Sequence, residues 1–293
     1  MSGDAQSDKQ NVIVQNPWLE TWRMYVKNKT AVFGLLLLIA IIVVTLFAPG
    51  LYGVNSYDIV WAPFGLPGEN GFLLGTDYLG RDILAGIFYG GRATMAVGLS
   101  AACCAVFLGV FIGALAGFYG KWVDTFLMRV TEFFQVLPPL LFAMVLVALF
   151  SPSLVTISLA IGLVSWPSVA RLTRGEFLKI KRLEYVVAAK ALSASNRRII
   201  WKIILPNCLP PLIVSATLNV GSAILFEAGL SFLGLGDPNV MSWGLMIGSN
   251  RDYIFQSWWA VTFPGLAIFL TVLSVSLIGD GLTDALNPKL REL

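Results

Sequence analysis

The sequence contains no histidine, few charged residues and only three cysteines. Charged residues make up 13% of the 293 positions, well below the ~25% typical of soluble domains, whereas 57% of the residues are apolar. Because histidine is the commonest general base and metal ligand, its absence argues against a metal centre. The cysteines lie in apolar runs and fit neither a metal spacing nor a disulfide framework. The net charge of +3 is small for a partner of nucleic acid, and most of the chain is predicted to lie outside water.

Motifs for phosphate binding and hydrolytic catalysis are also missing. No Gly-x-x-x-x-Gly-Lys-[Ser/Thr] loop occurs, since Gly120-Lys121 lacks both the preceding loop and the hydroxyl residue. No Gly-x-Ser-x-Gly or His-Glu-x-x-His segment occurs either. We therefore expect no catalytic residue, cofactor site or metal site in this chain.

The sequence contains long apolar runs instead of such motifs. A membrane crossing takes about 20 helical residues, so the uncharged run 133–170 is too long for one helix. The Ser151-Pro152-Ser153 turn signal divides it in two. The expected spans are 31–48, 93–120, 133–150, 153–172, 203–226 and 253–279. The sequence thus predicts an all-α polytopic membrane protein with six transmembrane helices.

Ionisable residues are nearly absent from these spans. Glu227 and Asp280 are the exceptions, and each lies near the end of a span, where snorkelling, helix-end placement or a place along a transport pathway would explain it. This scarcity argues against an ion-coupled secondary transporter, which needs charged residues at mid-membrane depth. It also argues against an intramembrane enzyme, which needs reactive groups converging at one depth.

The basic residues are divided unequally between alternate loops. Seventeen of the 20 Lys and Arg residues lie in segments on the side of the two termini, and only Arg81, Arg92 and Arg251 lie on the other side. The positive-inside rule therefore predicts a bacterial inner-membrane protein with both termini in the cytoplasm. The expected division is a cytoplasmic N-terminal segment (1–30), a first transmembrane helix (31–48), a periplasmic loop (49–92), a core of five helices (93–281) and a cytoplasmic tail (282–293). Within the core we expect a cytoplasmic loop at 173–205 and a periplasmic loop at 229–256.

The cytoplasmic loop at 173–205 is long, basic and helical in pattern. Val186, Ala189 and Leu192 recur at helical spacing, with lysine and arginine at other positions. The segment 193–196 interrupts the pattern and offers N-cap side chains for a second helix that starts near Arg197. Since connectors are commonly 2–8 residues, this helix–break–helix is expected to bind a partner.

The second span carries a stripe of small residues. Gly109, Gly113 and Gly117 repeat every fourth position, which lets two helix backbones approach closely. Packing within this chain's own bundle is the favoured interpretation, and a contact between subunits is the alternative.

Residues 184–206 resemble the EAA loop of binding-protein-dependent ABC importer permeases. The resemblance lies in Glu184-Tyr-Val-Val-Ala188-Ala189-Lys-Ala-Leu-Ser193, followed by Ile203-Ile-Leu205-Pro206. Val187 and Ser193 replace the Glu and Gly of that motif, and Glu184 offers a carboxylate one turn earlier.

Further segments resemble the dipeptide/oligopeptide/nickel branch of these permeases. They are Leu74-Gly75-Thr76-Asp77-Tyr78-Leu79-Gly80-Arg81-Asp82 with Gly91-Arg92, Leu230-Ser231-Phe232-Leu233-Gly234-Leu235-Gly236 with Trp243-Gly244, and Gly279-Asp280-Gly281-Leu282 with Asp284-Ala285-Leu286-Asn287-Pro288. In the last segment, Thr283 and Asn287 replace an expected Arg and Asp. From about Trp18 to Leu290, the chain resembles the C-type permease subunit of this branch.

The resemblance implies a type I ABC importer transmembrane-domain fold and a pore subunit that is not itself an enzyme. It implies four partners: a second, B-type permease that forms the other half of the pore, two ATPase subunits that bind ATP, and a periplasmic solute-binding protein. The cargo would be a di- or oligopeptide or a related small solute.

The resemblance also assigns two sets of residues. The ATPase-coupling set is Glu184, Ala188, Ala189, Leu192, Ser193, Arg197 and Arg198. The set at the pore or periplasmic gate is Arg81, Asp82 and Glu227, and capping or pairing at a helix start is the alternative role for the first two.

Overall fold

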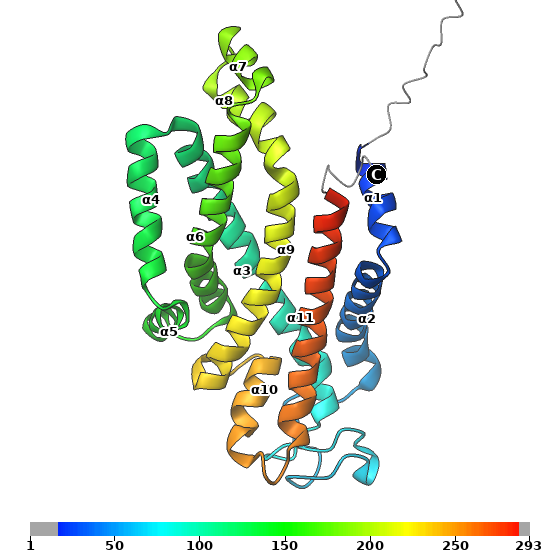
Figure 1. Cartoon of the computed structure of the whole chain (residues 1–293). Helices are drawn as coiled ribbons and strands as arrows, with labels where there is room; N and C mark the ends of the chain where they lie inside the picture. The colour runs from blue at the N-terminus through cyan, green and yellow to red at the C-terminus, as the bar shows by residue number, and fades with distance from the viewer. Residues whose placement is uncertain (1–16, 287–293) are drawn as a thin grey trace, which may run out of the picture.

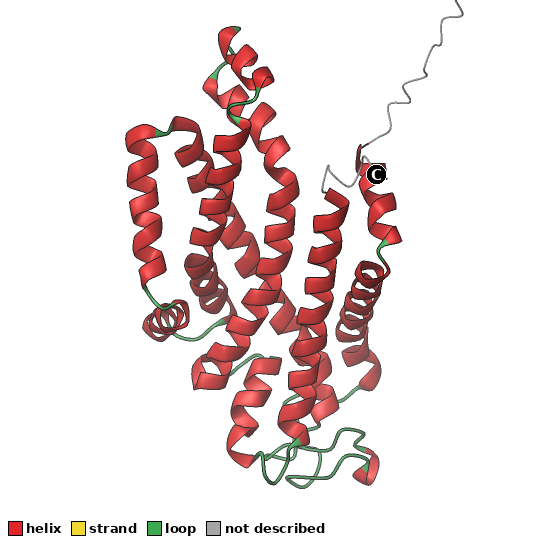
Figure 2. Ribbon diagram, in the orientation of Figure 1, coloured by secondary structure: helices red, strands yellow, loops and turns green. Residues whose placement is uncertain are grey.

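The computed structural model describes residues 17–286, and most of that part of the chain is helical (Figure 1, Figure 2). The helices long and apolar enough to cross a membrane are α2 (Lys29–Tyr52), α3 (Ile83–Tyr119), α6 (Leu154–Ile180), α9 (Leu205–Leu230) and α11 (Trp259–Leu286). The shorter elements are α1 (Pro17–Lys27), α4 (Lys121–Val136), α5 (Pro139–Phe150), α7 (Glu184–Ala191), α8 (Asn196–Arg198), α10 (Trp243–Asn250), single turns at Glu69–Gly71 and Arg251–Tyr253, and π-helical segments at Ile199–Ile204 and Ser231–Leu235. This helical membrane architecture confirms the predicted fold class.

The third predicted span is wrong as a single helix at 133–150. The structure divides it between α4 and α5, which meet at an angle of 87°, and the bent pair supplies the sixth candidate span. Pro138 and Pro139 cause the break, because a residue that precedes proline is disfavoured in helical conformation. α4 starts at Lys121, before the predicted span begins. Its charged residues interrupt the uncharged run in the sequence, but they do not interrupt the helix.

Other helices also extend beyond the uncharged runs. α3 begins at Ile83 instead of Ala93, so the loop predicted at 49–92 ends earlier. α6 continues to Ile180, which shortens the loop predicted at 173–205. α11 continues to Leu286, into the predicted tail, and Asn287 lies outside the described residues. In each case a helix continues through polar residues because its backbone hydrogen bonds do not depend on side-chain polarity.

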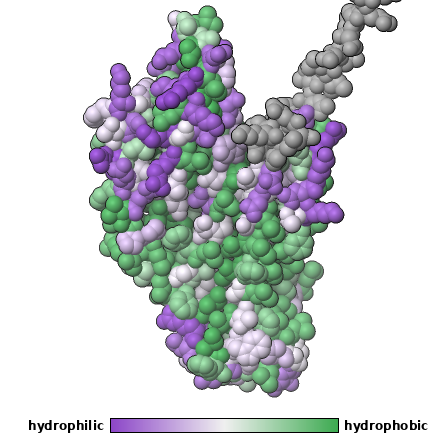
Figure 3. All heavy atoms as spheres, in the orientation of Figure 1, coloured by the Kyte–Doolittle hydropathy of each residue, from purple (hydrophilic) through white to green (hydrophobic). Residues whose placement is uncertain are grey.

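The two ends of the bundle carry different elements. α7 and α8 extend beyond one end, where α1 and the last turn of α11 also lie; we call it the α7 end (Figure 1). The loop 53–82 and α10 lie at the opposite end, which we call the α10 end. Between them, the face in Figure 3 carries a hydrophobic belt flanked by hydrophilic residues. This arrangement is that of a helical bundle in which successive spans would cross the membrane in alternating directions.

The glycine stripe joins α3 to α6 of the same chain, as the favoured interpretation predicted. A Cβ atom at Gly109 would lie 2.5 Å from the Val169 Cβ, and one at Gly117 would lie 2.5 Å from the Phe177 Cβ. Such separations are far below van der Waals contact, so only glycine allows the two helices to pack this closely. The pair α3–α6 runs between the two ends of the bundle and forms its central scaffold (Figure 1).

The segment between α1 and α2 contacts the last turns of α11, which belong to the C-terminal segment resembling the permease branch. Asn28 caps α2 by accepting a hydrogen bond from the Ala31 N–H (3.2 Å), and its amide donates to Asp284 Oδ2 (3.1 Å). Gly281 on α11 faces Ala31 and the buried ring of Tyr25. These contacts hold the start of the first span against the end of the last.

Candidate functional site

α7 is anchored to the bundle through one buried side chain. Val186 is 3% exposed and packs in an apolar cluster with Phe177 of α6 and Ile204 before α9. Beside it, Lys181 Nζ donates to the Phe118 carbonyl oxygen and lies 5.5 Å from the centre of the Phe118 ring. Burial lowers the pKa of Lys181, and the nearby charge of Lys190 lowers it further. α7 is thus held at a fixed place on the ends of α6 and α9.

The opposite face of α7 has no covering within the described chain. Leu192 is 84% exposed, Val187 56% and Tyr185 46%. Among the predicted coupling residues, Glu184, Ala188, Ser193, Arg197 and Arg198 are also exposed. Ala189 is half-buried because it lies one turn from Val186 on the face toward the bundle. Ala188 therefore lies closer than Ala189 to the centre of the exposed surface.

Ser193 ends α7 in the left-handed conformation, with φ of 58°. Its N–H donates to the Lys190 carbonyl oxygen (3.1 Å), and the Ala194 N–H donates to that of Ala189 (3.1 Å). This pair of bonds is a Schellman motif, in which glycine is the favoured residue at the position that Ser193 occupies. Ser193, which replaces the Gly of the EAA motif, therefore occupies a left-handed position, where a Cβ atom is unfavourable.

The predicted second helix of the loop begins at Asn196 and continues without a break into α9. The Ser195 hydroxyl accepts a hydrogen bond from the Arg198 N–H (3.4 Å), so the expected N-cap is confirmed. α8 extends from Asn196 to Arg198 and passes into the π-helical segment Ile199–Ile204, which leads into α9. Buried isoleucines at 199, 200 and 204 join this segment to the apolar cluster under α7.

Glu227 is buried at the α10 end and does not face an open pathway. Glu227 is 1% exposed, and its Oε1 accepts hydrogen bonds from the hydroxyl groups of Ser231 (2.8 Å) and Ser242 (2.7 Å). Its Oε2 accepts a longer bond from Thr94 of α3 (3.4 Å). Ser242 also caps α10 by accepting from the Leu245 N–H (3.1 Å). Glu227 therefore ties α9 to α3 and α10, and its place at the pore or periplasmic gate stays a prediction.

Asp82 caps the start of α3, which confirms the alternative role predicted for it. Its Oδ1 accepts from the Leu84 N–H (2.8 Å), and its Oδ2 accepts from the hydroxyl of Tyr52 at the end of α2 (2.5 Å). Arg81 lies over the Tyr57 ring, 5.1 Å from its centre, and makes no ion pair with Asp82 among the described residues. Asp82 thus joins the end of α2 to the start of α3, and Arg81 packs on the loop between them.

The rest of that loop motif folds into a hydrogen-bonded turn. Thr76 Oγ1 donates to the Ala62 carbonyl oxygen (2.8 Å) and accepts from the Gly65 N–H (2.7 Å). Asp77 Oδ1 accepts from the backbone N–H groups of Leu79 (2.9 Å) and Arg81 (2.8 Å). Burial raises the pKa of Asp77, and these backbone donors partly offset that effect. The motif resembling the permease branch is therefore a rigid element of the α10 end.

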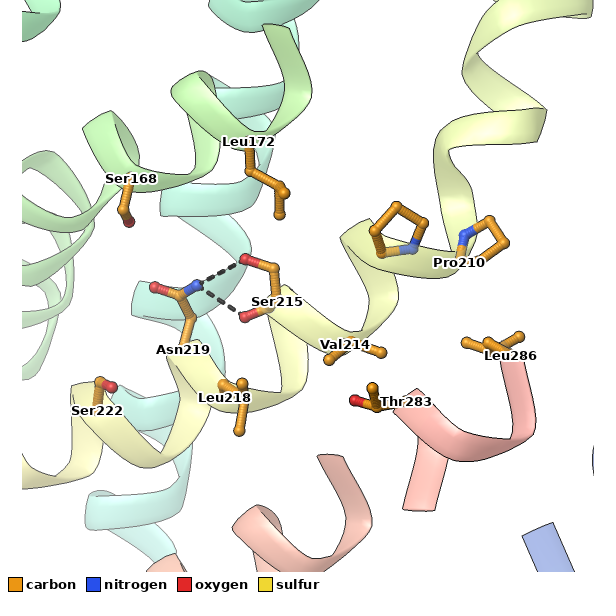
Figure 4. Close-up of a pocket in the computed structure, with 11 residues that line it drawn as sticks. Ser168, Leu172, Pro210, Val214, Ser215, Leu218, Asn219, Ser222, Thr283 and Leu286 are labelled. Atoms are coloured by element: carbon orange, nitrogen blue, oxygen red, sulfur yellow. Dashed lines mark hydrogen bonds between the residues drawn. The ribbon is translucent and has the colours of Figure 1, made fainter. Parts of the chain in front are cut away.

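A hollow of about 650 Å³ opens between α6, α9 and α11 (Figure 4). Most of its lining is apolar, and we call it the polar hollow for the five hydroxyl and amide side chains that also line it. Ser168 of α6 and Ser215 and Asn219 of α9 point toward the space between those helices. The Asn219 amide donates to the Ser215 carbonyl oxygen (2.7 Å), which leaves its own carbonyl oxygen free to accept. Ser222 and Thr283 add hydroxyl groups, and no charged side chain of residues 17–286 lines the hollow. The surface can exchange hydrogen bonds with a solute without a charged partner.

Several residues of these sites were not predicted from the sequence. Thr94 and Ser242 bind Glu227 from positions remote in the chain, and no local spacing signals that contact. Asn219 and Ser215 are polar residues one turn apart within a span, which is a usable signal for a pathway. Among the described residues, no group of three histidine, cysteine or acidic side chains is arranged to hold a metal ion.

A bundle of apolar helices, a hollow with hydroxyl and amide groups in its lining, and apolar side chains exposed beyond one end are typical of a membrane permease. Two family models match this chain: residues 109–292 match the binding-protein-dependent transport system inner membrane component, and residues 16–64 match the N-terminal transmembrane domain of oligopeptide transport permease C. The chain belongs to the family of binding-protein-dependent transport system inner membrane components. This membership replaces the alternative of an ion-coupled secondary transporter.

Relatives extend over almost the whole chain. The di/tripeptide transport system permease protein DppC of Pseudomonas aeruginosa (strain UCBPP-PA14) is 40% identical over 298 residues, which covers 98% of this chain and 97% of that protein. The dipeptide transport system permease protein DppC of Escherichia coli (strain K12) is 40% identical over 287 residues, 96% of each chain. A chain of the MetNI methionine ABC transporter, in inward-facing conformations, has a TM-score of 0.58 at 18% identity and covers 68% of this chain and 94% of that one. The last similarity shows a shared fold.

Proposed function

We propose that this chain is one half of the translocation pore for di- or oligopeptides or a related small solute. A second permease forms the other half, and two ATPase subunits, which bind and hydrolyse ATP, dock at the α7 end. A solute-binding protein delivers the cargo at the α10 end. Similarity to dipeptide permeases along almost the whole chain supports the choice of cargo.

The exposed apolar surface of α7 carries the proposal. Tyr185, Val187 and Leu192 extend this surface beyond the hydrophobic belt, where lipid does not cover it. A helix that leaves apolar side chains in water is suited to a groove on a protein partner, where they would be buried. The flanking Arg197 and Arg198 would pair with an acidic rim.

The charge distribution supports a cytoplasmic place for the α7 end. Basic residues cluster in the segment from Arg171 to Lys202, and the α10 end has only Arg81, Arg92 and Arg251. The positive-inside rule then places both ends of the chain and the ATPases on the same side of the inner membrane.

The polar hollow is the proposed pathway for the cargo within this chain. Hydroxyl and amide groups can replace water around a peptide bond, whereas a charge there would bind ionic side chains selectively. Closure of the ATPases would move α7, and the packed α6 and α9 would carry that movement as rigid bodies, opening the hollow to alternate sides.

Substitution of Ala188 by aspartate tests the proposal. The charge would lie in a close helix-in-groove contact without a partner, and such burial costs several kcal/mol. A loss of ~3 kcal/mol weakens association more than 100-fold. Ala188→Asp should therefore accumulate in the membrane, lose the ATPase subunits in a detergent pull-down and stop ATP-driven dipeptide uptake in proteoliposomes.

Asn196→Asp is the matched control because it adds a negative charge at an exposed position of the same loop outside α7. It should retain the ATPases and transport. Wild-type retention of the ATPases by Ala188→Asp, together with full uptake, would overturn the assignment of α7.

A further inference from the structure

Arg92 lies on α3 at the α10 end, and no carboxylate of the described residues forms an ion pair with its guanidinium group. Its Nε donates to the Thr45 carbonyl oxygen (2.9 Å) and one terminal nitrogen donates to that of Leu46 (2.5 Å). Thr45 precedes Pro49 by four residues, and proline has no N–H to complete that helical bond. Two branches of the guanidinium group thus satisfy α2, while the other terminal nitrogen has no hydrogen-bond partner in the described chain.

The free side of Arg92 borders a cavity of about 450 Å³ at the α10 end. Asn55, Ser56, Tyr57, Tyr89 and Asn239 supply its other polar side chains, and no acidic side chain of the described residues lines it. The volume lies within the range of ~300–1,000 Å³ typical of small-ligand sites. The cavity thus combines a cation, amide donors and aromatic walls.

Asp237 is already bound to the backbone. It lies two residues before Asn239, which lines the cavity. Its Oδ1 accepts from the Asn239 N–H (2.9 Å) and its Oδ2 from the Leu154 N–H (3.2 Å). The Asn239 side chain itself makes no hydrogen bond within the described residues. Asp237 is therefore held away from a role as the counter-ion of Arg92.

We propose that this cavity binds a carboxylate group, with Arg92 as its charged partner and the Asn239 amide as a second donor. The geometry suits a carboxylate because a guanidinium edge and a neutral amide can donate to its two oxygens. The inference rests on the proposed function, which supplies two sources: the carboxylate terminus of the peptide cargo, or an acidic side chain of the docking solute-binding protein.

Asn239→Asp is the sharpest test, because it replaces an amide by a carboxylate of nearly the same shape and leaves the bonds of Arg92 to α2 intact. The complete importer, with both permeases and ATPases, is reconstituted in proteoliposomes with its binding protein and dialanine. We expect the rate of uptake at low concentrations of loaded binding protein to fall at least tenfold. Asn239→Lys should lose far less, since it adds charge of the favourable sign.

Asn70→Asp is the matched control at an exposed position of the same end that does not line the cavity. It should transport as the unmodified chain does. A fall of the maximal uptake rate alone identifies the cargo as the source of the carboxylate. A rise in the concentration of binding protein needed for half-maximal ATPase stimulation identifies the binding protein as its source.

Uptake by Asn239→Asp within twofold of the unmodified chain, or equal losses in Asn239→Asp and Asn239→Lys, would overturn the carboxylate site. Absence of ATP-driven dialanine uptake by the unmodified importer would instead overturn the proposed cargo. The two failures are therefore distinguishable.

Discussion

At the α10 end, buried hydrogen-bonding side chains join elements that are far apart in the sequence, whereas α7, beyond the opposite end, is held mainly by apolar packing. Glu227 alone binds hydroxyl groups of three elements, and Asp82 binds both α2 and α3. α7 contributes a single buried valine and leaves its outer face uncovered. Hydrogen-bond networks fix one arrangement, while an exposed apolar face gains stability only when a partner covers it.

Under the proposed function, this difference would let one chain serve two partners. The α10 end would keep a constant shape for the delivery of cargo, and α7 would complete its packing against the ATPases. The α3–α6 scaffold connects them, since its glycine contacts leave little room for the helices to slide. Substitutions at the α10 end, in the α3–α6 scaffold and at the end of α7 should therefore change accumulation, stability and local exchange by different amounts.

The largest expected effect comes from reversing the charge of Glu227. Glu227→Lys places a buried cation against three hydroxyl groups and removes the acceptor that they share, at a cost of several kcal/mol. The variant should fail to accumulate in the membrane. Glu227→Gln keeps an acceptor oxygen for Ser231 and Ser242, so it should accumulate. Wild-type accumulation and transport by Glu227→Lys would show that the network does not hold the α10 end.

A smaller effect is expected in the scaffold between the ends. A Cβ atom at Gly113 would lie 2.6 Å from the Thr173 Cβ, so Gly113→Ala should destabilise the protein by about 1–3 kcal/mol through overpacking. Gly175→Ala on α6 is the matched control, because nothing lies within 4 Å of its Cβ position. That variant should gain about 0.5–1 kcal/mol from helix propensity. Thermal unfolding in detergent measures both, and equal shifts would contradict the close approach of α3 and α6.

The smallest effect is expected at the end of α7. Ser193→Gly removes the strain of a Cβ atom in the left-handed conformation and should stabilise the local turn by about 1 kcal/mol. Hydrogen exchange of the Ser193 and Ala194 amides should slow by about fivefold. Ser193→Val should accelerate it, because a β-branched side chain disfavours this conformation. Unchanged exchange in both variants would contradict the observed helix end.

The sequence predicted the features that depend on local pattern. Apolar runs located the spans, the segment 193–196 was expected to supply a helix N-cap, and the glycine stripe was expected to pack within the bundle. The bend at Pro138 was missed because an uncharged run does not show whether its helix is straight. The partners of Glu227 were missed because burial of a carboxylate depends on Thr94 and Ser242, which only the tertiary fold brings together.

Photo-crosslinking from the two ends tests the central claim most directly. A crosslinking amino acid placed at Leu192 of α7, which is 84% exposed, or at Ile59 of the loop 53–82, which is 69% exposed, reports the neighbour of each end in the assembled importer. Position 192 should form adducts with an ATPase subunit, and position 59 with the solute-binding protein. Adducts of the binding protein with position 192, or of an ATPase with position 59, would contradict the assignment of the two ends.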